Sequence, residues 1–189
     1  MSPTLVIALL TAAAAIGLTA YWITRYDIDE FRGHGPLRDT GVFSYYRYHA
    51  PLGSMALAKP GTHVMKFSGV PSVKMALMLY FPSEMAPIPE PTFELLRSLR
   101  TTLTAEIVDS RGKVICRGIG TPAGRDISNE WRLMSSSNNA AYWHQACRDV
   151  PLLRQTDYEL RLSVEDVDPR SPPLQISVML EGGGIELAV

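Results

Sequence analysis

Two stretches of this chain carry an apolar side chain at every second position, and this alternation restricts the possible folds more than any other feature. They cover residues 73–81 and 158–165. Successive side chains of a β-strand point to opposite faces of a sheet, so a period of two predicts strands with one buried face. The apolar members are Val73, Met75, Leu77, Leu79 and Phe81, then Tyr158, Leu160, Leu162 and Val164. Both stretches are therefore expected to be half-buried antiparallel strands.

Further short apolar runs, separated by glycine and proline, follow one another along the chain. Gly112 lies between two of them and predicts a tight hairpin turn. Residues 92–99 have helical spacing and predict a helix of about two turns. The additional expected strands are residues 43–48, 62–68, 103–107, 113–117, 131–134 and 174–180. Many short strands with little helix predict an all-β fold, an antiparallel β-sandwich of the immunoglobulin-like or jelly-roll-like kind.

One of these strands has a specific likeness. From Thr156 to Val164, a tyrosine, Tyr158, leads an alternating apolar run. In this respect the stretch resembles the penultimate strand of immunoglobulin-like and fibronectin-type sandwiches. The resemblance covers about a twentieth of the chain, and it implies a sandwich without implying a function.

The N-terminal segment is the second constraint, because Ser2 to Thr24 contain no charged side chain. As a helix with a rise of about 1.5 Å per residue, this segment would cross a hydrocarbon layer of about 30 Å. Ala13 and Ala15 offer a small-residue cleavage site, so a signal peptide is the alternative. Cleavage there would leave an apolar tail on the mature protein. We therefore expect an uncleaved anchor, one N-terminal transmembrane helix through residues 4–24.

These features divide the chain into three parts. Residues 1–25 are expected to form the membrane anchor, or an uncleaved signal segment, and residues 26–41 a polar tether. Residues 42–189 are expected to form the β-sandwich domain. The chain would thus be a single-pass membrane protein with one folded domain.

The side of the membrane is indicated by two opposing signals. Arg25, Arg32 and Arg38 follow the apolar segment, and the positive-inside rule would keep the domain in the cytoplasm. Cys116 and Cys147 are the only cysteines, and one disulfide fits an oxidising compartment, whereas two buried free thiols are the alternative. We expect the disulfide, and therefore a domain on the periplasmic or extracellular side, with the cytoplasmic side as the alternative.

Composition and motif content bear on the function classes. A net charge of −1 gives no electrostatic attraction to nucleic acid, so we expect no nucleic-acid binding. No serine or cysteine is accompanied by the histidine and carboxylate pattern of a nucleophilic hydrolase. Paired ligand spacings for zinc are also missing. We therefore expect no enzymatic activity, no metal and no cofactor.

A proline-rich stretch is the first candidate for partner binding. Residues 83–91 carry Met85 and Ile88 among prolines. A stiff loop can present such apolar side chains at low entropic cost. The alternative is a loop that folds back over the edge of the sandwich and blocks strand pairing.

Aromatic residues near polar loops are the second candidate. Trp131, Tyr142 and Trp143 belong to this group, and an adjacent pair, Tyr142 and Trp143, precedes Cys147. Exposed rings of this kind bind sugars by stacking. Aromatic residues are equally common inside strands and cores, which is the competing interpretation.

Together these observations predict a non-enzymatic, membrane-anchored, extracytoplasmic binding module that engages a protein partner in the envelope. Its architecture is similar to that of small anchored immunity or assembly proteins of bacterial envelopes, and this likeness concerns architecture alone. A carbohydrate-binding β-sandwich that uses exposed aromatics is the first alternative. A hydrolase whose site assembles from residues far apart in sequence is the second.

Overall fold

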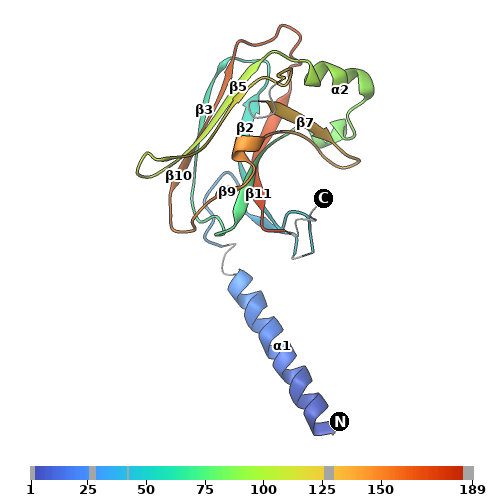
Figure 1. The fold of residues 1–189 in the computed structure, drawn as a ribbon, viewed down its shortest axis with the longest axis vertical. Coiled ribbons are helices and arrows are strands. Elements are labelled where there is room, and N and C mark those ends of the chain that lie inside the picture. Colours follow the sequence, from blue (N-terminus) through green and yellow to red (C-terminus); the bar gives the residue numbers. More distant parts are fainter. Residues whose placement is uncertain (1–2, 26–28, 42, 126–129, 185–189) are drawn as a thin grey trace.

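The structure is a computed structural model that describes residues 3–25, 29–41, 43–125 and 130–184. Helix α1 (Pro3–Arg25) points away from a body made of two layers of strands (Figure 1). No helix in these described ranges combines the length and the apolar character needed to cross a membrane.

The body consists of two antiparallel sheets. The large sheet has the order β1 (Arg38–Asp39), β2 (Tyr48–Ala56), β11 (Gln175–Gly182), β4 (Lys74–Tyr80), β8 (Ala140–His144) and β7 (Trp131–Ser135), and β9 (Val150–Pro151) also pairs with β4. The small sheet has the order β3 (Gly61–Phe67), β10 (Tyr158–Glu165), β5 (Thr102–Asp109) and β6 (Val114–Gly120). The predicted antiparallel β-sandwich is confirmed.

The core lies between the sheets and follows the alternation of the sequence. In β4, Met75, Leu77 and Leu79 face inward and are at most 1% exposed. In β10, Leu160 and Leu162 are fully buried in the same core. Each such side chain stabilises the fold by about 1.5 to 3 kcal/mol when it is removed from water. Burial of the two alternating strands therefore holds the two sheets against each other.

The first long strand lies later in the chain than the sequence indicated. Residues 43–46 form turns and bends, and β2 begins at Tyr48 and continues through Pro51 and Gly53. The expected strand at residues 43–48 is therefore wrong in its position. The pairing register between β2 and β11 shifts between Pro51 and Gly53, so a β-bulge lies next to the proline, which lacks an N–H.

Part of the segment expected to be a tether belongs to the folded body. Phe31 and Leu37 are buried in the core, and Arg32 and Ser68 exchange two backbone hydrogen bonds of 3.0 Å. The folded body therefore includes residues before 42. The expected domain start, Val42, lies outside the described residues.

The predicted disulfide between Cys116 and Cys147 is present, with a Cα–Cα distance of 5.4 Å. Cys116 belongs to β6 in the small sheet. Cys147 ends the short 3-10 helix η2 (Gln145–Cys147), which follows β8 of the large sheet. The bond thus links the two layers of the sandwich covalently at one end.

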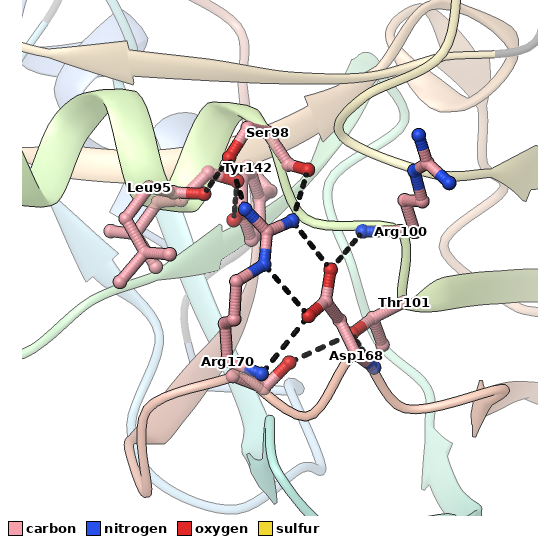
Figure 2. Close-up of polar contacts among 9 residues, drawn as sticks. Leu95, Ser98, Arg100, Thr101, Tyr142, Asp168 and Arg170 are labelled. Carbon is pink, nitrogen blue, oxygen red and sulfur yellow. Dashed lines mark hydrogen bonds and ion pairs between the residues drawn. The ribbon is translucent and has the colours of Figure 1, made fainter.

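The predicted helix is present as α2 (Glu90–Arg97), which begins two residues earlier than expected. Figure 2 shows how the loop after β10 holds its C-terminal end. The carboxylate of Asp168 accepts hydrogen bonds from the Arg100 N–H at 3.0 Å and from Arg170 Nη2 at 2.8 Å, and Arg170 Nη2 donates to the Ser98 carbonyl at 3.0 Å. Hydrogen bonds from Arg170, then from Arg100, hold the pKa of Asp168 far below its usual range.

Candidate functional site

A second, small apolar cluster lies on the outer face of the large sheet. Ala76, Met78 and Ala141 are buried there, and Tyr80 and Trp143 pack against them. The outer face of a sandwich sheet is normally polar, because water covers it. Apolar side chains gathered on this face therefore mark it as a candidate binding surface.

The cluster forms part of a cavity of about 250 Å³. The strands β4, β8 and β7 contribute Ala76, Met78, Trp143 and Met134, the turn between β1 and β2 contributes Tyr45 and Tyr46, and the segment after η2 contributes Arg148. We call this group of seven residues the outer-face cavity. Segments far apart in sequence meet here because β8 pairs with β4 on one side and with β7 on the other.

Strand register places the central ring of the cavity. Met78 lies directly opposite Trp143 in the pairing of β4 with β8, and Arg132 lies opposite Trp143 in the pairing of β8 with β7. Side chains of directly opposed residues share a face of the sheet and lie about 5 Å apart at Cβ. Trp143 is therefore flanked by a flexible apolar side chain and a cation.

Arg148 is the exposed cation of the cavity. Its Cζ atom lies 5.7 Å from the centroid of the Trp143 ring, a cation–π contact. Among the described residues, no carboxylate lies within ion-pair distance of Arg148. The N–H groups of an exposed guanidinium beside a ring remain available to a ligand.

The turn that carries Tyr45 and Tyr46 is held by polar contacts. Arg47 donates hydrogen bonds to Asp39 from Nε and Nη2, with Nη2 to Oδ2 at 2.7 Å, and Thr40 Oγ1 donates to the Tyr46 carbonyl at 2.8 Å. Burial alone would raise the pKa of Asp39, but its hydrogen bonds and the Arg47 charge hold that pKa below its usual value. The two tyrosine rings contact edge to face, with centroids 4.6 Å apart. They are thus positioned before any ligand binds.

A buried carboxylate lies beside the cavity in β11. Glu181 is 2% exposed, and it accepts hydrogen bonds from the Tyr80 hydroxyl at 2.7 Å and from His49 Nδ1 at 2.5 Å. The hydrogen bond with Glu181 raises the pKa of His49, although burial opposes this. Burial, followed by the Tyr45 and Glu181 charges, raises the pKa of Tyr46 to about 12. His49 therefore lies beside the buried carboxylate, and the hydroxyl groups of Tyr46 and Tyr80 stay protonated.

The order of Thr40, His49 and Glu181 is superficially that of a nucleophile, a base and an orienting acid. His49 Nε2 lies 3.4 Å from Thr40 Oγ1. However, the Thr40 hydroxyl donates its proton to the Tyr46 carbonyl, so it can only accept from His49. His49 therefore ties the turn to β11 through its contact with Glu181, and it does not activate Thr40.

Of the aromatic residues singled out in the sequence, Trp143 lies in the outer-face cavity. Tyr142 is fully buried in the core and its hydroxyl donates to the Leu96 carbonyl at 2.7 Å (Figure 2). Trp131 is 1% exposed and its Nε1 donates to the Leu103 carbonyl at 2.7 Å. Because Tyr142 and Trp143 are successive in β8, they point to opposite faces, and the expected two-ring platform cannot form.

The apolar residues Met85 and Ile88 of the proline-rich stretch are partly buried and buried, respectively. Ile88 is 7% exposed, and its backbone N–H donates to Ser135 Oγ at 2.9 Å. Met85, at the end of the 3-10 helix η1 (Ser83–Met85), packs against the core. Both side chains thus pack on the sandwich.

The sequence held one signal for the cavity. In the alternation of residues 73–81, the face that should be wet carries Ala76, Met78 and Tyr80 beside a single charge, Lys74. A solvent face with that composition indicates a covered or binding surface. Arg148 and the network around Glu181 had no such signal, because their partners come from distant strands.

Comparisons of this chain with protein-family models, with curated proteins and with solved structures find no significant match. The site must therefore be interpreted from its own chemistry. In the described part of the chain, no three His, Cys, Asp or Glu side chains are grouped so as to hold a metal ion. Cys147, which has metal-like spacing from His144, is committed to the disulfide.

Proposed function

We propose that this chain is a membrane-tethered, non-enzymatic binding protein of an extracytoplasmic compartment, and that it engages a protein partner through the outer-face cavity. The observation that carries the proposal is the composition of that cavity. Tyrosine, tryptophan, methionine and arginine are the residues enriched at the centres of protein–protein interfaces. Six of its seven members belong to these four types.

The tether is supported by the sequence and exposure of α1. Ser2 to Thr24 carry no charge, and side chains such as Ile7, Leu10 and Ile16 are more than 60% exposed in the isolated chain. Exposed apolar side chains along a helix favour contact with a lipid surface or with a partner. Alkaline extraction of native membranes tests this part: the chain is expected in the pellet, and release into the supernatant contradicts a tether.

The extracytoplasmic side is supported by the bond between Cys116 and Cys147, since disulfides persist in oxidising compartments. Alkylation of the protein in intact cells tests this assignment. Two blocked thiols before reduction support an extracytoplasmic domain, and two reactive thiols place it in the cytoplasm.

We further infer that the sandwich is of the jelly-roll kind. The strand pairings are those of one long antiparallel hairpin rolled into two sheets: β2 pairs with β11, β3 with β10, β4 with β8 and β5 with β6. Jelly rolls include lectin domains, among other functions. The fold alone therefore leaves sugar binding open as the second candidate.

Sugar binding is favoured specifically by Trp143, a partly exposed ring on a sheet face. A glycan array with the full chain in detergent separates the candidates. Binding to a sugar that is lost in Trp143→Ala supports the second candidate. The absence of any bound sugar removes it.

Capture from crosslinked native membranes tests the leading proposal. We expect one partner protein to be recovered with the wild-type chain and lost with Trp143→Ala. The matched control is Val64→Ala, an exposed apolar residue of β3 in the other sheet. Equal recovery with all three chains, or recovery with none, contradicts the proposal.

A further inference from the structure

The outer-face cavity has properties that specify a class of ligand. Its volume of about 250 Å³ falls below the range of about 300 to 1,000 Å³ that is usual for small-molecule sites. A cavity of this size suits one large side chain better than a whole cofactor or an oligosaccharide. A projecting side chain of a larger molecule fits a cavity of this size.

The charges around the cavity are unbalanced in one direction. Glu181 is buried and is engaged by His49 and Tyr80, so it presents no negative charge to a ligand. Arg132, opposite Trp143, is paired with Glu130 at 3.2 Å. Arg148 is exposed, and its guanidinium contacts only a ring among the groups described above. The rim of the cavity thus offers one uncompensated cation.

We propose that the outer-face cavity binds an acidic segment of a partner protein, in which a large apolar side chain is followed or preceded by Asp or Glu. The apolar side chain lies against Trp143 and Met78, and the carboxylate receives hydrogen bonds from the Arg148 guanidinium. This inference rests on the proposed function and narrows it to one recognition chemistry. Arg148 sets the specificity, and Trp143 provides the contact area.

The pairing is physically favourable because the cation already lies beside the apolar contact surface. The cation–π contact places the Arg148 guanidinium 5.7 Å from the centroid of the Trp143 ring before a ligand binds. A guanidinium–carboxylate pair made at the edge of an apolar cavity is also less screened than one on an open surface. Both effects favour a carboxylate over an amide at that position.

Selection from a random peptide library on the full chain in detergent micelles tests the inference. We expect the enriched peptides to share a large apolar residue beside Asp or Glu. On Arg148→Gln, the apolar preference persists, while affinity for acidic peptides falls about tenfold. On Trp143→Ala, no shared sequence is enriched. Arg132→Gln is the matched control, because this arginine lies beside the same ring and already has a carboxylate partner; its peptides should match those of the wild type.

The outcomes separate this inference from the broader proposal. If wild-type peptides lack acids, or Arg148→Gln keeps the acidic preference, the acidic ligand is refuted while a partner captured through Trp143 still supports the proposed function. If no partner is captured, or if capture does not depend on Trp143, both the inference and the proposed function are refuted. Decanoate serves as the probe for a lipid ligand. The inference is also overturned if decanoate binds more tightly than every selected peptide and this binding depends on Trp143.

Discussion

Trp131 and Trp143 lie on neighbouring strands of the large sheet and point to opposite faces. Trp131 is 1% exposed, contacts the His144 ring edge to face and donates to a backbone carbonyl. Trp143 is half-buried on the outer face, under Arg148. The same residue type therefore serves the core at one position and the candidate site at the other.

The two tryptophans should respond differently to truncation. We expect Trp131→Ala to lower the free energy of unfolding by about 3 to 5 kcal/mol, because it leaves a cavity in the core. Trp143→Ala should cost about 1 kcal/mol, since its ring loses only partial packing and one cation–π contact. Urea unfolding of both variants measures this difference, and equal losses would show that both rings belong to the core.

The charge state of His49 is the second feature at this scale. Its hydrogen bond with Glu181 raises the pKa of His49 in the folded protein above the ordinary value near 6.5. The contribution of His49 to stability is therefore complete below that ordinary value and is lost as the pH rises through the folded pKa. The turn carrying Tyr45 and Tyr46 is consequently held most firmly at mildly acidic pH.

An NMR titration of the histidine rings measures the effect. The midpoint of His49 should lie above 6.5 in the wild-type chain and should fall in Glu181→Gln, which removes the charge while keeping the shape. His144 is the internal control, because burial lowers its pKa. A wild-type midpoint of His49 at or below 6.5 would show that the ion pair with Glu181 does not form.

At the scale of elements, local sequence was informative where one strand face is buried and the other is wet. The alternation of residues 158–165 predicts β10, and Gly112, with a φ of +79°, predicts the hairpin of β5 and β6. The position of β2 could not be predicted, because Pro51 and Gly53 usually end strands and here lie at a bulge. The choice of faces in β7 and β8 also escaped prediction, since each strand has only five residues and β8 has an aromatic residue on each face.

The disulfide joins β6 to η2 across the two layers and closes a loop with a sequence separation of 31. Restricting the unfolded chain in this way stabilises a fold by about 2 to 4 kcal/mol. We expect the variant Cys116→Ala/Cys147→Ala to lose stability of this size in urea. A reducing agent should destabilise the wild type and leave the variant unchanged. Identical wild-type and variant midpoints would contradict a stabilising role.

At the scale of the whole molecule, the sheet order depends on pairs that no local pattern encodes. β2 pairs with β11 and β3 with β10, so partners lie about a hundred positions apart. The candidate site has the same origin, since its residues come from the β1–β2 turn, β4, β7, β8 and the segment after η2. Sequence could therefore predict the sandwich and Trp143, while the cavity required the assembled sheet.

Site-specific photocrosslinking in native membranes tests most directly whether the outer face of the large sheet is the contact surface. A photoreactive amino acid replaces Met134, which lines the cavity and is 38% exposed, or Val64, which is 54% exposed on the small sheet. We predict a discrete adduct with one protein from position 134, lost when Trp143→Ala is added, and none from position 64. Adducts of equal yield from both positions, or an adduct at 134 that persists without Trp143, would contradict the account.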